Sequence, residues 1–152
     1  MIKKILLGGF SAGLADFLYA TINTVVAGGS WMRPWKGVAG GLLGRAALDG
    51  GMETVITGIA LHFFICFVAA ALLYVIASRV KWLPRQWIIL GILYGVAFLA
   101  VMNYVILPLS AIGRGIYPFN KIYITVFFHI LLVGWPTAFF ISRALKRGAV
   151  QN

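Results

Sequence analysis

The chain carries near its start the stretch ILLGGFSAGLADFLYATINTVVA, Ile5 to Ala27, in which Asp16 is the only charged residue. Its 23 residues exceed the roughly 20 that cross ~30 Å of hydrocarbon as a helix. The stretch therefore predicts a membrane-spanning helix. A carboxylate in the middle of such a helix is costly in lipid, so it normally faces protein or water. Asp16 is thus the first candidate for a functional residue.

Three further stretches of similar length, Val55 to Ala77, Trp87 to Leu107 and Ile122 to Ser142, also lack charges. Hydrophobic residues make up 62% of the 152 residues and charged residues 11%, with a mean hydropathy of +0.97. Soluble domains average roughly 45–50% and 25%. We therefore expect an all-α fold, a four-transmembrane-helix bundle that forms a single integral membrane domain over residues 1–152. The expected helices cover about 4–27, 52–78, 86–108 and 121–144.

The formal net charge of +10 is concentrated between the apolar stretches, where it indicates membrane topology rather than nucleic-acid binding. Both termini fall on the side with more Lys and Arg, which is normally cytoplasmic. We therefore expect a multi-pass protein of a bacterial inner membrane with both termini in the cytoplasm. The basic residues on that side are Lys3, Lys4, Arg79, Lys81, Arg85, Arg143, Lys146 and Arg147, and those on the other side are Arg33, Lys36, Arg45, Arg114 and Lys121.

The connection between the first two expected helices, Gly28 to Gly51, has a helical periodicity of its own. Trp31, Trp35, Val38 and Leu42 recur there at helical spacing, among glycines and basic residues. Amphipathic aromatic rings concentrate at the level of the lipid headgroups. We therefore predict a short interfacial or re-entrant helix between helices 1 and 2, with Trp31 and Trp35 at headgroup level.

Glycine pairs four residues apart predict where helices pack closely, because small residues let two backbones approach each other. The first helix contains Gly9 and Gly13, and the third contains Gly91 and Gly95. We expect a neighbouring helix to lie against each pair.

Two prolines interrupt the apolar stretches. Pro108 should kink or end the third helix, because proline cannot donate a backbone hydrogen bond and disfavours helical geometry in the residue before it. Pro136 lies inside the fourth stretch and frees the carbonyl of Leu132. Another group has to satisfy that carbonyl in lipid.

Six polar side chains in or beside the expected helices form the candidate site. Asp16 and Asn23 share one stripe of the first helix, so both should face inward. If consecutive helices alternate in direction, four of the six belong to the non-cytoplasmic half, while Asp16 and His62 lie deeper. We interpret the set as an outward-facing polar cavity that relays protons or binds a cation or polar solute. The six are Asp16, Asn23, Glu53, His62, Asn103 and His129.

Structural roles are open for the same residues. Asp16 can instead bond across the bundle and hold helices together, and His62 and His129 can be ordinary packing or hydrogen-bonding histidines.

Near the ends of the helices, structural roles are favoured. Arg45, Asp49 and Glu53 are spaced i, i+4, i+8, which predicts an ion pair at the surface. Asn103 lies shortly before a proline-ended helix and is expected to bond local backbone.

A redox function is the alternative, since His62 and His129 on different helices could be the axial ligands of a b-type haem. No second histidine pair supports it. Cys66 is the only cysteine, which excludes an intrachain disulfide, and neither a nucleophile elbow nor a His-Glu-x-x-His motif is present. We therefore expect no cofactor, no metal and no enzymatic activity.

In the segments Gly41 to Ala47 (GLLGRAA), Leu61 to Phe64 (LHFF) and Met102 to Ser110 (MNYVILPLS), the chain resembles a group of small uncharacterised bacterial inner-membrane proteins. It is similar, more distantly, to the YagU-like proteins. The resemblance covers nearly the whole chain and implies a four-helix inner-membrane protein, without chemistry for particular residues. Small multidrug transporters also carry an acidic residue in the first of four helices, but the long Gly-rich connection departs from their pattern.

These observations predict a small polytopic inner-membrane protein that acts without a cofactor. Either it is a transport or solute-binding protein, or it is an accessory subunit of a larger complex. Its expected surroundings are the lipid bilayer and either a membrane-protein partner or further copies of itself, with no nucleic acid.

Overall fold

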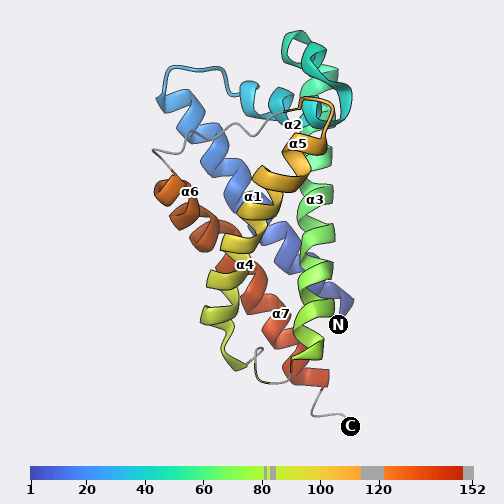
Figure 1. The fold of residues 1–152 in the computed structure, drawn as a ribbon, viewed down its shortest axis with the longest axis vertical. Helices are drawn as coiled ribbons and strands as arrows, with labels where there is room; N and C mark the ends of the chain where they lie inside the picture. The colour runs from blue at the N-terminus through green and yellow to red at the C-terminus, as the bar shows by residue number, and fades with distance from the viewer. Residues whose placement is uncertain (81, 83–84, 114–121, 149–152) are drawn as a thin grey trace.

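The computed structural model describes residues 1–80, 82, 85–113 and 122–148, and these residues are helical apart from short connections (Figure 1). Four helices are long and apolar enough to cross a membrane, namely Ile2–Val26, Met52–Arg79, Trp87–Leu109 and Ile122–Lys146. These ranges differ from the expected ones by only a few residues. The all-α class is confirmed, because the described residues contain no strand.

Two of the four long helices are interrupted by π-helical segments, and a short helix lies between the first two. In chain order the elements are α1 (Ile2–Val26), α2 (Arg33–Leu43), the 3-10 helix η1 (Arg45–Asp49), α3 (Met52–Arg79), α4 (Trp87–Val101), the π-helix η3 (Met102–Ile106), α5 (Leu107–Leu109), α6 (Ile122–Phe128), the π-helix η5 (His129–Gly134) and α7 (Trp135–Gly148). The connection that carries Arg114 and Lys121 lies outside the described residues, as does Lys81.

The helices are arranged so that α1 packs against both α3 and α7, while α4 packs against η5 and α7. Consecutive helices α3 and α4 share hardly any close contacts in the described part of the chain. Both termini lie toward the same end of the molecule (Figure 1). The Lys4 ammonium joins the two terminal helices there by donating to the carbonyl of Arg143 at 3.1 Å.

The apolar core lies in the half of the bundle near the termini. It consists of side chains from α3, α4 and α7, and Ile5 of α1 packs against it. Burial of such aliphatic surface among the helices fixes this end as one compact unit. The buried members are Leu73, Ala77, Leu90, Ala138 and Ile141.

The expected role of the first glycine pair is confirmed. A Cβ on Gly9 would lie 3.0 Å from the Cα of Phe67, and one on Gly13 would lie 3.4 Å from the Cβ of Cys66. The backbone of α1 therefore lies directly on α3 at these two positions.

The second pair has the same role between α4 and η5. A Cβ on Gly95 would lie 2.7 Å from the Cα of Ile130. A Cβ on Gly134, on the opposite side of the contact, would overlap the carbonyl of Gly91. Three glycines thus permit backbone-to-backbone contact here.

Both prolines follow a π-helical segment, with η3 ending two residues before Pro108 and η5 two residues before Pro136. The amide just before each proline donates to the carbonyl five residues earlier, that of Met102 or Ile130. The i→i−5 pattern defines a π-turn, and it widens the helix where the proline ring would clash with the carbonyl four residues earlier. The third helix therefore continues through Pro108 and ends at Leu109.

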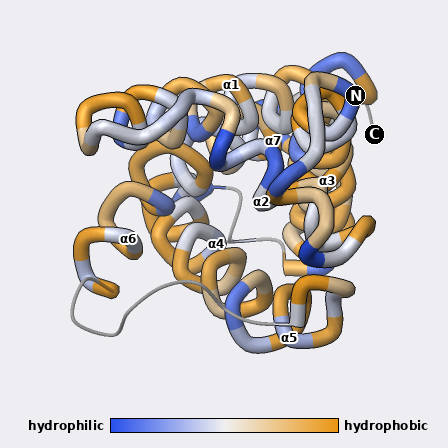
Figure 2. Tube along the Cα trace, turned by 90° about the horizontal axis from the view of Figure 1, so that it is seen from above, coloured by the Kyte–Doolittle hydropathy of each residue, from blue (hydrophilic) through white to orange (hydrophobic). Residues whose placement is uncertain are grey.

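The helix α2 lies across the end of the bundle opposite the termini, between α1 and α3 (Figures 1 and 2). Trp31 is 41% exposed, whereas Trp35 is only 1% exposed. The expected headgroup level stays a prediction for both residues, but the ring of Trp35 is buried inside the protein. The physical reason is Gly58 of α3, which lies so close to the backbone of α2 that a Cβ there would overlap the Trp35 carbonyl.

Replacing Gly58 with alanine tests this contact. We expect Gly58→Ala to destabilise the protein by about 1–3 kcal/mol, the usual effect of overpacking, because α2 has to move away from α3. Thermal unfolding in detergent, followed by tryptophan fluorescence, measures the change.

The matched control is Gly37→Ala in α2, where a Cβ would meet no atom within 4 Å. It should be neutral or stabilising by up to about 1 kcal/mol, the difference in helix propensity between glycine and alanine. Equal destabilisation by both substitutions would contradict the proposed contact.

Candidate functional site

Asp16 is directed toward the junction where α1 meets its two neighbours. Gly8 and Tyr19 of α1 lie against α7 and α6, whereas Gly9 and Gly13 lie against α3. At about 100° per residue, Asp16 falls between these two faces of the helix. The side chain is partly buried. The expected inward orientation of this part of the stripe agrees with that position.

The Asp16 carboxylate makes no hydrogen bond or ion pair with any residue that the structure describes. It interacts electrostatically with Tyr19 on its own helix and with Cys66 on α3. This carboxylate in the middle of an apolar helix thus has no fixed hydrogen-bonding or ion-pair partner within the described residues.

His62 of α3 lies against α1 at Gly13. It is buried, and its Nε2 lies 2.9 Å from the carbonyl oxygen of Gly13. Because a carbonyl only accepts, Nε2 donates this hydrogen bond, and in the neutral ring Nδ1 is left as an acceptor. Helix carbonyls point toward the C-terminal end, so the imidazole lies beside the turn of α1 that contains Asp16.

An aromatic cluster covers the side of this turn that faces α2. The ring of Trp35 stacks on Phe17 with centroids 4.4 Å apart, and it meets the His62 ring edge-on at 5.3 Å. Phe63 lies on the other side of the imidazole, also at 5.3 Å. The cluster separates His62 and the Asp16 turn from the end of the bundle that carries α2.

Two buried polar atoms near this cluster have no hydrogen-bond partner among the described residues, namely Nε1 of Trp35 and Oγ1 of Thr21. Sequence reasoning missed both. The signal that could have identified Trp35 was Gly58, because a glycine on α3 lets the backbone of α2 approach closely at Trp35. Together with Asp16 and His62, these groups form a set of hydrogen-bonding positions inside the apolar half of α1 and α3.

Asn103 and His129 bond to their own helices. The Asn103 amide donates to the carbonyl of Leu99 at 3.1 Å, which confirms the expected contact with local backbone. His129 donates from Nδ1 to the carbonyl of Thr125 at 2.9 Å. Both residues belong to π-helical segments, and neither bonds to Asp16 or His62.

Asn23 and Glu53 lie at the surface. Asn23 is exposed although it shares a stripe with Asp16, so this stripe is buried only in its first part. Glu53 is exposed, and its carboxylate accepts from the amide of Gly51 at 2.7 Å, which stabilises the start of α3.

The predicted ion pair among Arg45, Asp49 and Glu53 is wrong for the structure as described. Arg45 and Asp49 lie in a 3-10 helix that is followed by two glycines, so the regular α-helical spacing on which the prediction depended does not exist here.

The structure therefore places His62 against the turn of α1 that follows Gly13 and contains Asp16, and no hydrogen bond joins Asn23, Glu53, Asn103 or His129 to either residue within the part of the chain that is described. His62 and His129 each donate to a backbone carbonyl and pack in separate aromatic groups, which does not favour a shared haem iron. Within the described residues, no three His, Cys, Asp or Glu side chains are grouped to hold a metal ion.

Comparison of the chain with protein-family models, curated proteins and solved structures finds no match. The resemblance to YagU-like proteins stays a prediction. Function is therefore inferred from the site itself.

The bond between His62 and Gly13 can be tested by two substitutions. We expect His62→Leu to destabilise the protein by about 0.5–2 kcal/mol, because interhelical hydrogen bonds in membrane bundles contribute this much. His62→Gln keeps an N–H donor and should lose less. Thermal unfolding in detergent compares the two, and a Gln variant as unstable as the Leu variant would contradict the assigned bond.

Proposed function

We propose that the protein is a small transport or solute-binding protein of a bacterial inner membrane, and that Asp16 binds its solute. The observation that carries the proposal is the partly buried, inward-directed carboxylate that has no hydrogen bond or ion pair within the described residues. An ionisable group inside a membrane helix is costly unless it is paired or hydrated. A small cation, or a polar solute with N–H or O–H donors, would satisfy it.

The surroundings of Asp16 suit reversible binding. His62 has its donor occupied by Gly13 and offers Nδ1 as an acceptor, while Trp35 offers an unpaired indole N–H. A solute that contacts these groups as well as Asp16 would both donate hydrogen bonds to the protein and accept one from it.

The proposal places four helices across the bilayer with both termini in the cytoplasm. It is supported by the four long apolar helices, by the position of both termini at one end and by the excess of basic residues on that side. The α2 helix then lies at the non-cytoplasmic surface, as the interfacial helix predicted from the sequence.

Reporter fusions test this topology. Green fluorescent protein fused after Asn152 should fluoresce, because it folds in the cytoplasm, and alkaline phosphatase at the same position should be inactive. Fusions placed after Gly44 should give the reverse. Phosphatase activity at the C-terminus would overturn the orientation.

Asp16→Asn tests the binding role, because it removes the charge and keeps the shape. In reconstituted vesicles, we expect flux of monovalent cations or protons to fall by about tenfold or more, which corresponds to roughly 1.4 kcal/mol of lost interaction. Purified Asp16→Asn protein should keep its helical content and its elution volume.

The matched control is Glu53→Gln, which makes the same chemical change at an exposed carboxylate whose contacts are with Gly51 and Thr54. It should conduct like the wild type. Unchanged flux in the Asp16→Asn variant would contradict the proposed binding role of Asp16. An inactive wild type that always purifies with a stoichiometric membrane partner would instead assign the accessory role.

A further inference from the structure

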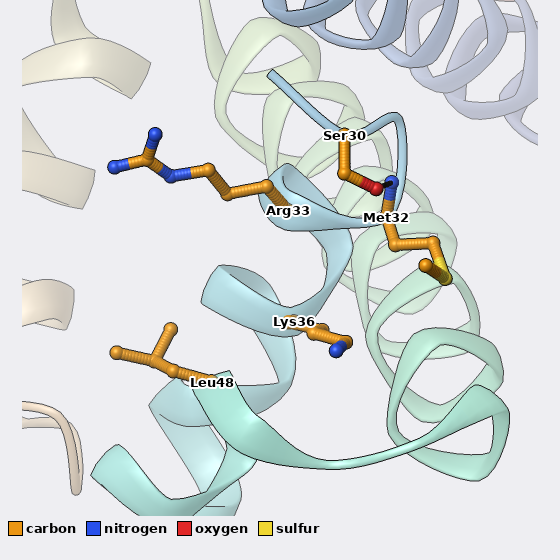
Figure 3. A pocket seen from close by; sticks show the side chains of 5 residues that line it. All are labelled: Ser30, Met32, Arg33, Lys36 and Leu48. Carbon is orange, nitrogen blue, oxygen red and sulfur yellow. Dashed lines mark hydrogen bonds between the residues drawn. The ribbon is translucent and has the colours of Figure 1, made fainter.

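A surface pocket of about 410 Å³ lies beside the first turn of α2, at the end of the molecule opposite the termini (Figures 1 and 3). It is separate from Asp16, which lies in the middle of α1. The residues that line it come from the connection before α2, from α2 itself and from η1, and they are Ser30, Met32, Arg33, Lys36 and Leu48.

The polar side of the pocket is cationic. Arg33 and Lys36 both line the pocket, and their long side chains extend from α2 in different directions (Figure 3). No acidic residue lines it, and neither cation forms an ion pair with a residue that the structure describes. Glu53 interacts electrostatically with Lys36, but its carboxylate accepts a hydrogen bond from the Gly51 amide.

Ser30 adds a neutral donor. Its Oγ accepts a hydrogen bond from the amide of Met32 at 3.3 Å, and its own proton is left to donate. An anion with several oxygens can therefore receive charge-assisted bonds from the two cations and a further bond from this hydroxyl.

The remaining walls are apolar, which selects among anions. Met32 and Leu48 line the pocket, and Leu48 is 46% exposed. Three further exposed apolar residues belong to this region: Trp31 just before α2, and Leu42 and Leu43 at the end of α2. A free inorganic anion gains nothing from such walls, whereas the glycerol and first acyl carbons of a lipid lie against them as its phosphate meets the cations.

We propose that this pocket binds the phosphate of an anionic phospholipid headgroup at the membrane surface. The inference rests on the proposed membrane placement and is independent of the role of Asp16. Bound lipid would hold α2 against the bilayer, because the headgroup contacts the α2 cations while Leu48 and Met32 contact the acyl region.

Native mass spectrometry of the full chain in detergent tests the proposal. The protein is titrated with phosphatidylglycerol, which carries a net negative charge, and with phosphatidylcholine, which is zwitterionic. We expect clear preference for phosphatidylglycerol. In Arg33→Gln/Lys36→Gln its affinity should fall roughly 10- to 30-fold, since each basic residue near an anionic surface contributes about a fivefold factor.

The control is Arg79→Gln/Arg85→Gln, which removes two exposed cations from the opposite end of the bundle. It should retain the wild-type preference, and all variants should elute and melt like folded protein. The proposal would be overturned if both double variants lost affinity for phosphatidylglycerol equally, or if the wild type did not prefer phosphatidylglycerol over phosphatidylcholine.

Inorganic phosphate distinguishes the two sources of the anion. It should fail to displace phosphatidylglycerol at low millimolar concentration, and displacement there would assign the pocket to free phosphate instead of lipid. Asp16→Asn should bind phosphatidylglycerol like the wild type. If the protein transports cations but does not prefer phosphatidylglycerol, only this inference is contradicted. If it prefers phosphatidylglycerol but transports nothing, only the proposed function is contradicted.

Discussion

Backbone-to-backbone contact at glycines is the constraint on which this structure depends. In the bilayer proposed for this chain, apolar side chains would gain little by leaving lipid for another helix, so close packing would have to supply the association. The chain meets this requirement where α1 lies on α3, where α4 lies on η5 and where α2 lies on α3 at Gly58. The last contact shapes the candidate site. It places Trp35 between α1 and α3, where its ring packs against Phe17 and covers His62.

The prolines impose a second constraint. In a bilayer, every backbone hydrogen-bonding group of a helix would have to be satisfied within the protein. Each missing amide is accommodated by a π-turn just before it, so both helices continue with a shifted register. Side chains near these turns bond to carbonyls one turn earlier, as Asn103 does to Leu99 and Thr137 to Val133. Polar residues that resemble a binding site in sequence therefore serve the backbone here.

Features that depend on one helix or on a local pattern could be predicted from the sequence. Length and hydropathy predicted the four long helices, and glycine spacing predicted two close contacts. Placement across helices was not predictable in the same way. Tryptophan is a residue type that concentrates at membrane interfaces, which is why Trp35 was expected there. Its burial depends instead on Gly58, which follows it by 23 positions. Likewise, the stripe that contains Asp16 and Asn23 is continuous on α1, but neighbouring helices bury only its first part.

The division of the bundle into two halves gives Asp16 its significance. Below it, toward the termini, Leu73, Ile141 and their neighbours form a packed aliphatic core. His62 lies at its level, bonded to the Gly13 carbonyl. Within the described residues, Thr21 and Trp35 carry unpaired polar atoms on the α2 side, as Trp135 and Ser142 do on the side of the termini. A charged or polar solute loses less hydration free energy among groups that can bond to it than among aliphatic side chains. Under the proposed function, a solute at Asp16 would therefore depend on the contact of α2 with Gly58, which places the Trp35 ring beside His62.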